Sequence, residues 1–223
     1  MKDYKEFSRN MSISIVMFMT PLLSLFYGKA GKNTVDSYFL IFNMTFAMVA
    51  TYVQSCLIAE EQEKNTLRAL MLSPANVREI FLGKSLLTFL VTTITLALCI
   101  MFIEYRPMNM GIMIVAFILS AVFYISLGNL IGLFAKTIME ASVYSFPVIG
   151  IFSVGSYIRF LSEQYPILKA AHYLPNIQLI EIATKVEAGN TLLEMLPAFA
   201  IILVWSVVTI IVTVILFKRR MVD

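Results

Sequence analysis

Two short stretches contain the Gly-Lys pair of a phosphate-binding loop, GKNT at residues 31–34 and GKS at residues 83–85. Such a loop needs a glycine five residues before the paired glycine, so that successive backbone N–H groups can surround a phosphate. Arg78 stands there before Gly83, and Phe26 stands there before Gly31. Neither stretch predicts ATP hydrolysis by this chain. We therefore expect no catalytic residue and no cofactor here, and we expect ATP and Mg²⁺ on a separate polypeptide.

Residues that could carry a proton or hold a metal ion are also placed unfavourably for either task. Pumps and secondary transporters keep an ionisable residue inside a membrane span, and the apolar segments of this chain contain none. The single histidine, His172, lies outside those segments and is expected at the surface. Cys56 and Cys99 lack metal-ligand spacing. We expect no metal site, and we expect both cysteines to serve in packing.

The most polar long stretch is EEQEKNTLRALMLSPANVREIFLGK, residues 60–84. Glu60 and Lys64 have the i,i+4 spacing of a helical ion pair. Pro74 disfavours helix at Ser73, so the pattern predicts one amphipathic helix over 60–72 and a second one that meets the next apolar segment at residues 83–84. A simple connection between spans needs only a few residues. We interpret the stretch as a surface that another protein holds.

Six apolar segments must position this stretch, at about 11–27, 37–59, 85–103, 109–135, 142–158 and 195–217. With 59% hydrophobic residues, the chain has too little polar sequence to cover so many buried core helices. A bilayer core of about 30 Å needs about 20 apolar residues per helix. The fold class predicted is an all-α polytopic membrane protein with six transmembrane helices, forming one transmembrane domain over residues 1–223.

The positive charges predict the orientation of these spans. If both termini are cytoplasmic, the inner segments hold 11 of the 17 Lys and Arg residues, and residues 60–84 are cytoplasmic. Residues 1–10 mix acids with bases and no small-residue cleavage site follows, so we expect an interfacial segment and no cleaved signal peptide.

Residues 60–84 carry a resemblance to the ABC-2 permeases, the membrane subunits of type-2 ABC exporters. The stretch fits the approximate family pattern E-x-E-[KR]-x-T-[LI]-x-x-L-x-x-[ST]-P, followed by Ile and then Gly-Lys. The matching residues are Glu61, Glu63, Lys64, Thr66, Leu67, Leu70, Ser73, Pro74, Ile80, Gly83 and Lys84. Arg68 stands where the family often has Glu. LGNLIGLFAKTIMEASVYSFPVI and LPNIQLIEI resemble later family segments more loosely.

The resemblance implies that residues 60–84, Glu60 included, form the coupling helix that sits in a cleft of a cytoplasmic ABC ATPase. It also implies two copies of that ATPase, a second permease subunit of identical or related sequence, a bacterial cell membrane, and short helices that re-enter the outer leaflet within residues 159–192. No nucleic acid is expected as a partner.

Two further segments attract attention. GNLIG places Gly128 and Gly132 in a small-xxx-small motif, which permits close helix packing within the bundle or between subunits. NIQLIEIATKV reads as a helix capped by Asn176 and ended near Gly189, with a Glu181–Lys185 pair and an apolar face. We expect Leu179 and Ile182 on that face to form an extracellular gate seated at the lipid boundary; an interfacial loop helix is the alternative.

The sequence therefore predicts the permease subunit of an ATP-driven exporter, working with a separate ATPase as at least a permease dimer. The spans are uncharged, which favours an amphipathic or hydrophobic cargo such as a peptide or drug-like molecule. The alternative is a six-span scaffold or sensor that docks a cytoplasmic protein without transporting anything.

Overall fold

A computed structural model describes residues 11–29, 31, 34–64, 77–155, 157–158 and 166–220. These residues form helices and connecting turns, and no strand occurs among them. The elements are α2 (Met11–Lys29), α3 (Val35–Thr45), the π-helix η1 (Phe46–Val53), α4 (Gln54–Glu63), α6 (Val77–Ile103), α7 (Met110–Phe134), α8 (Ile138–Ser153), the 3-10 helix η2 (Pro166–Tyr173), α10 (Pro175–Glu187) and α11 (Leu192–Arg220).

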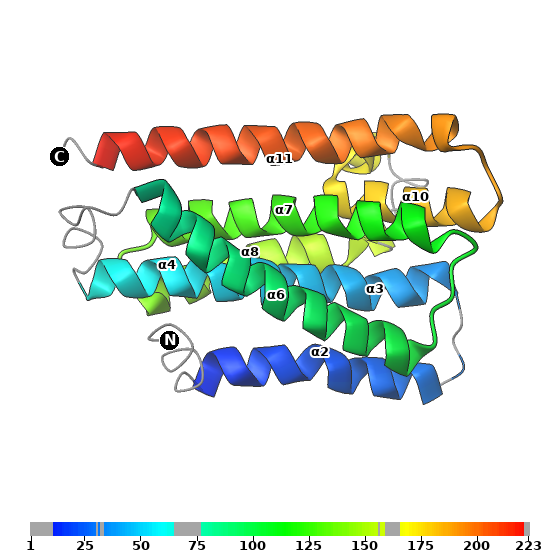
Figure 1. The fold of residues 1–223 in the computed structure, drawn as a ribbon, viewed down its shortest axis with the longest axis horizontal. Helices are drawn as coiled ribbons and strands as arrows, with labels where there is room; N and C mark the ends of the chain where they lie inside the picture. Colours follow the sequence, from blue (N-terminus) through cyan, green and yellow to red (C-terminus); the bar gives the residue numbers. More distant parts are fainter. Residues whose placement is uncertain are drawn as a thin grey trace.

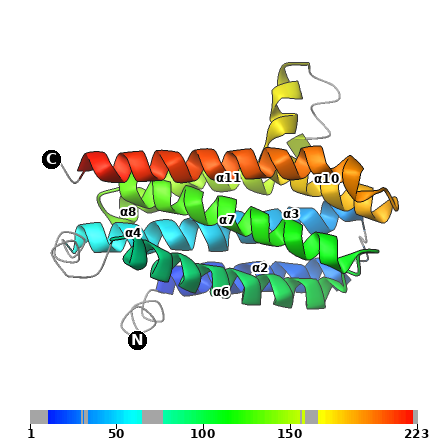
Figure 2. The ribbon, with the colours of Figure 1, turned by 45° about the horizontal axis from the view of Figure 1, so that its top comes forward.

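The long helices run side by side along one axis, as Figure 1 shows. The beginning of α2, the end of α4, the beginning of α6 and the end of α11 lie at the same end of the bundle. That end, which carries residues 60–64 and 84, is called the coupling end below. In the view of Figure 2, η2 projects from the side of the bundle, near α10.

One continuous helical segment forms the centre of the bundle. It consists of α3, η1 and α4, and 89% of its most apolar window is buried, against 17% for α11 at the edge. Phe39, Phe42 and Phe46 on this segment meet Phe117 and Tyr124 of α7 in a row of aromatic contacts. Aromatic pairs with tilted or offset rings pack favourably over large areas. The centre therefore holds α7 closely, whereas α2 packs mainly on α6, and α11 on α7 and α10.

Four helices are long and apolar enough to cross a membrane: Val35–Glu63, Phe81–Ile103, Met110–Phe134 and Leu192–Phe217. These agree with four of the six predicted spans. The other two predicted spans correspond to the shorter apolar helices Ser14–Lys29 and Ile138–Ser153. At 1.5 Å per residue, the 16 residues of α8 reach only about 24 Å, less than a bilayer core of about 30 Å. Six crossings therefore remain a prediction.

The structure describes only the two ends of the expected helix pair in residues 60–84, because residues 65–76 lie outside the described residues, so the pair stays a prediction. Residues 60–63 complete α4, and α6 passes from Val77 to Ile103 with no break at Gly83. Good helix formers surround Gly83, and no atom within 4 Å would meet a Cβ there, so nothing forces a bend. The described parts of the stretch thus extend two membrane helices.

Candidate functional site

The coupling end contains the described part of the predicted docking stretch. Glu60, Glu61, Glu63 and Lys64 lie at the end of α4, and Gly83 and Lys84 lie in the first turns of α6. Ile80 belongs to α6, but its side chain is outside the description. Thr66, Leu67, Leu70, Ser73 and Pro74 lie outside the described residues, so their predicted docking role stays a prediction.

Glu60 and Lys64 form the predicted pair on the outer side of α4. The Lys64 ammonium lies 2.5 Å from Oε1 of Glu60, and its side chain is well exposed. Lys64 also ends the helix, because its N–H donates to the carbonyl of Glu60 while its own ψ is near 0°. A cation in this place suits the negative end of the helix dipole. The spacing prediction is confirmed.

Glu61 faces the inside of the bundle and pairs with Lys84. Lys84 Nζ lies 2.9 Å from Oε1 of Glu61, and the two side chains are only 7% and 9% exposed. Lys84 also donates to the carbonyl of Leu57, one turn earlier on α4, at 3.5 Å. A buried ion pair is tolerated where each charge has a partner and further hydrogen bonds. This contact joins α4 to α6.

Gln62 provides hydrogen-bond donors for the last carbonyls of α7. Its side-chain Nε2 donates to the carbonyls of Gly132 and Leu133, at 2.9 and 3.0 Å. The last carbonyls of a helix have no partner within the helix, so a side chain from elsewhere must satisfy them when they are buried. Gln62 supplies that partner from α4.

Glu63 meets the beginning of α8. Its Oε2 accepts the N–H of Ile138, the first residue of α8, at 2.9 Å. Thr137 caps the same helix by accepting from Glu140 N–H, and Glu140 in turn accepts from Lys136 N–H. Carboxylates are favoured at a helix beginning, where unpaired N–H groups and the helix dipole attract negative charge. The short turn between α7 and α8 is therefore held on both sides by consecutive residues of α4.

The three contacts of Glu61, Gln62 and Glu63 are called the helix-end clamp below. They join the end of α4 to α6, to the end of α7 and to the beginning of α8. Sequence reasoning picked out the two acids but missed Gln62. A usable signal was its helical spacing from Ser55 and Ile58, because all three residues face the same part of α7.

A layer of neutral polar side chains lies deeper in the bundle, next to the clamp. Gln54 donates to Asn129 Oδ1 at 2.7 Å and accepts from the hydroxyl of Thr88. Asn129 also donates to Ser85 Oγ at 3.1 Å. Hydrogen bonds of this kind fasten helices in an apolar medium, where an unpaired polar group is costly. Gln54 and Thr88 thus bond neighbouring helices.

Gly128 and Gly132 lie where α7 approaches the central helix most closely. An added Cβ at Gly128 would lie 2.6 Å from the carbonyl oxygen of Thr51, and one at Gly132 would lie 2.7 Å from that of Ser55. Only a residue without a side chain permits this approach. The motif therefore packs within the chain, and it holds α7 directly beside the residues of the clamp.

The opposite end of the bundle is organised around α10. Leu179 and Ile182 are fully buried in the main core, so the expectation that they seat at a lipid boundary is wrong. The predicted Asn176 cap is also wrong: α10 begins at Pro175, whose fixed φ suits a first helical position. The Asn176 side chain instead donates to the carbonyl of Phe152 at the end of α8. The predicted end of the helix near Gly189 is confirmed.

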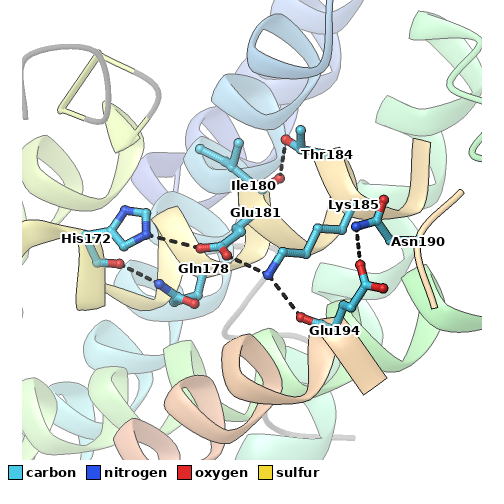
Figure 3. A network of polar contacts seen from close by, with 8 residues as sticks. All are labelled: His172, Gln178, Ile180, Glu181, Thr184, Lys185, Asn190 and Glu194. Carbon is cyan, nitrogen blue, oxygen red and sulfur yellow. Dashed lines mark hydrogen bonds and ion pairs between the residues drawn. The ribbon is translucent and has the colours of Figure 1, made fainter. Parts of the chain in front are cut away.

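A polar network covers α10 on its outer side, as Figure 3 shows. Glu181 pairs with Lys185 at 2.7 Å, as the spacing predicted, and also with His172 at 3.2 Å. Lys185 donates to the backbone carbonyl of Glu194 at the beginning of α11. The sequence offered no signal for the His172 contact, because it joins two separate elements.

Within the described ranges, no three His, Cys, Asp or Glu residues come together in a way that could hold a metal ion. The polar side chains of the coupling end are engaged with one another and with helix ends. These contacts tie the end of α4 to three neighbouring helices.

A bundle of apolar helices with polar clamps at its ends defines a polytopic membrane protein. Residues 5–215 match the model of the family described as ABC-2 family transporter protein, and the chain belongs to that family. It is accordingly a membrane permease of an ABC transporter. No curated protein matches the chain.

Proposed function

We propose that this permease exports its cargo with a separate ABC ATPase that docks on residues 60–84 and hydrolyses ATP. The observation that carries the proposal is the helix-end clamp. The docking stretch leaves α4 after Lys64 and re-enters a described helix at Val77. The Glu61–Lys84 pair ties the two helices that flank it. A displacement of the stretch would thus move α4 and α6 together.

Gln62 and Glu63 extend the displacement to the other half of the bundle. Through them, movement of the end of α4 reaches the last carbonyls of α7 and the first N–H of α8. Close packing at Gly132 leaves little room for α7 to slip along the central helix. On this proposal, Glu60 and Lys64 face the ATPase, whereas Glu61 acts inside the permease.

The outer segment fits the re-entrant arrangement that the resemblance implies. Trp205 lies midway along the candidate span Leu192–Phe217, and its Nε1 donates to the carbonyl of Tyr173 at 2.9 Å. At its far end, α10 approaches the beginning of α11 through Lys185 and Glu194. We propose that α10 begins within the outer half of the bilayer and gates exit through the buried Leu179 and Ile182.

The remaining parts of the proposal concern assembly and cargo. We propose a permease dimer with two ATPase copies in a bacterial cell membrane, both permease termini being cytoplasmic. The cargo proposed is a hydrophobic peptide or drug-like molecule, because the candidate spans carry neutral polar groups rather than ion-relay residues along their apolar lengths.

Co-purification of a tagged permease with its ATPase tests this proposal, combined with efflux of a lipophilic fluorescent dye and a hydrophobic peptide from the same cells. Leu70→Asp would place an unpaired charge on the predicted apolar stripe, at a cost on the order of several kcal/mol. We expect it to release the ATPase, or to leave ATP hydrolysis without efflux. Glu104→Lys, in the turn between α6 and α7 at the opposite end, is the control.

The result with Leu70→Asp decides between the proposals. If this variant keeps its full complement of ATPase and normal efflux, residues 60–84 are not the coupling segment. If a cytoplasmic protein without ATPase activity co-purifies instead, the scaffold interpretation replaces the exporter.

A further inference from the structure

A side chain of α10 holds the end of α8. Helix α8 ends at Ser153, because Val154 leaves the helical conformation with a ψ of 26°. Asn176 donates its side-chain Nδ2 to the carbonyls of Ile151 and Phe152, at 3.3 and 3.0 Å. The last carbonyls of a helix have no partner within the helix, so Asn176 supplies what the end of α8 lacks.

A second side-chain amide, Asn43 of α3, reaches the same place. Its Nδ2 donates to the backbone carbonyl of Asn176 at 3.4 Å. Gly155 lies against both amides: a Cβ there would be 2.7 Å from Nδ2 of Asn176 and 3.4 Å from Nδ2 of Asn43. Only glycine leaves room for both amides as they stand. The helices α3 and α10 and the end of α8 therefore meet around two amide side chains.

The groups that the two amides face decide how each amide is turned. A backbone carbonyl only accepts hydrogen bonds, so the nitrogen of each amide must point toward it and the oxygen must point elsewhere. Both side chains, Asn43 and Asn176, are fully buried, and no group within the described residues donates to either Oδ1. The buried hydroxyl of Ser153 also has no partner there. Buried polar groups left over in this way are those that ordered water satisfies in folded proteins.

We propose that Asn43, Asn176 and Ser153 bind an ordered water molecule where α3, α8 and α10 meet. The two amide oxygens need two donors, and one water supplies two. The Ser153 hydroxyl donates to the oxygen of the same water. A single molecule with three hydrogen bonds, the typical number for buried water, thus satisfies all three groups. The three groups are uncharged, so a cation would have to exchange its hydration shell for neutral ligands alone, which favours water.

The site lies within the apolar length of the bundle. At 1.5 Å per residue, Asn43 is about 12 Å from the beginning of the candidate span Val35–Glu63. The bound water therefore belongs to the packed interior, where it ties α10 to α3 and to the end of α8. This inference rests on the hydrogen bonds of these helices and does not depend on the proposed export or ATPase docking.

Solid-state NMR of the permease in lipid bilayers, with isotope-labelled Asn and Gln side chains, tests the site. Magnetisation transferred from water protons reaches the groups that lie beside a water molecule, so we expect transfer to the side-chain amides of Asn43 and Asn176. Gln54 is the matched control, because it is fully buried on the same helical segment as Asn43 but is bonded to Asn129 and Thr88. We expect no transfer to Gln54.

Two variants remove parts of the site. In Gly155→Ala the new Cβ would collide with Nδ2 of Asn176, so we expect transfer to both amides to fall to the level of Gln54. Gly150→Ala on α8 is the control, since its Cβ meets no atom within 4 Å, and it should keep the transfer. Asn43→Leu removes one acceptor, and we expect transfer to Asn176 to fall. Backbone signals of α7 report whether a variant has kept the fold.

Three results would overturn the proposal. They are no transfer to Asn43 and Asn176 in the natural protein, equal transfer to Gln54, and full transfer to Asn176 in a folded Asn43→Leu variant. Replacing Na⁺ in the buffer by K⁺ or by choline should leave both amide signals in place. A change in their positions would assign the site to a cation instead of water.

Discussion

The ammonium of Lys84 lies 2.9 Å from the carboxylate of Glu61, and both groups are buried between α4 and α6. The 22 residues that lie between them in the chain make up most of the predicted docking segment, residues 60–84. Because this buried pair joins the ends of α4 and α6 that flank the segment, we expect the two helices to move together. On the proposed function, this contact carries movement of a docked ATPase to the spans.

Removing one partner of the Lys84–Glu61 pair should lower the free energy of unfolding more than removing both partners. Lys84→Met leaves the Glu61 carboxylate buried, and we expect a loss of about 3 kcal/mol in the free energy of unfolding. Lys84→Met combined with Glu61→Gln should recover most of that loss. Unfolding in detergent, followed by circular dichroism, measures both; equal stabilities of the single and double variants would contradict the buried pairing.

Replacing Gln62 should separate docking from transport. Gln62→Leu removes two hydrogen bonds from the end of α7, and we expect a loss of about 1–2 kcal/mol in the free energy of unfolding. The ATPase should still co-purify, because the Gln62 side chain contacts α7 and the residues proposed to face the ATPase, Glu60 and Lys64, are unchanged, while dye efflux falls. Gln62→Lys retains a donor and should restore part of the efflux. Normal efflux in Gln62→Leu would show that α7 does not follow α4 through this contact.

Gly132→Ala should destabilise the bundle, since the new Cβ would collide with the Ser55 carbonyl and the Ile58 side chain. Overpacking of this kind costs about 1–3 kcal/mol. Gly150→Ala is the matched control, because no atom lies within 4 Å of its Cβ position and alanine favours a helix by about 0.8 kcal/mol. The midpoint temperature of thermal unfolding should fall in Gly132→Ala and rise in Gly150→Ala. The same direction in both would argue against close α4–α7 packing.

Glu104→Gly should stabilise the turn between α6 and α7. Glu104 has φ of 56°, and the N–H of the next residue, Tyr105, donates to the carbonyl of Ile100. This is the glycine position of a helix-ending motif, where a side chain costs about 1 kcal/mol. Glu104→Ala removes the charge but keeps the strain, so only the glycine variant should gain thermal stability. An equal gain in both would assign the effect to charge.

Patterns of spacing along single helices could be read from the sequence. Four of the predicted spans, the Glu60–Lys64 pair and the Glu181–Lys185 pair agree with the structure, because each depends on residues close together in the chain. The motif in residues 60–84 also indicated the family, which the match over residues 5–215 shows.

Contacts between distant segments could not be read in this way. Glu61 resembled its acidic neighbours and was assigned to the ATPase surface, yet a helix turns by about 100° per residue, so adjacent charges point to different partners. The direction of each depends on where α6, α7 and α8 lie. The burial of Leu179 and Ile182 was missed for the same reason, since an apolar helical face predicts an apolar neighbour without saying whether it is lipid or protein.

The sequence by itself determined the helical class, the apolar lengths and the charged stretch, because composition and local periodicity are properties of consecutive residues. Only the tertiary structure decided that Gln62 completes α7, that Glu63 meets α8, and that His172 faces Glu181. The first two contacts lie where close packing at Gly128 and Gly132 fixes the position of α7 against the central helix. Packing brings together side chains that lie far apart in the chain, and no local pattern in the sequence indicates that they meet.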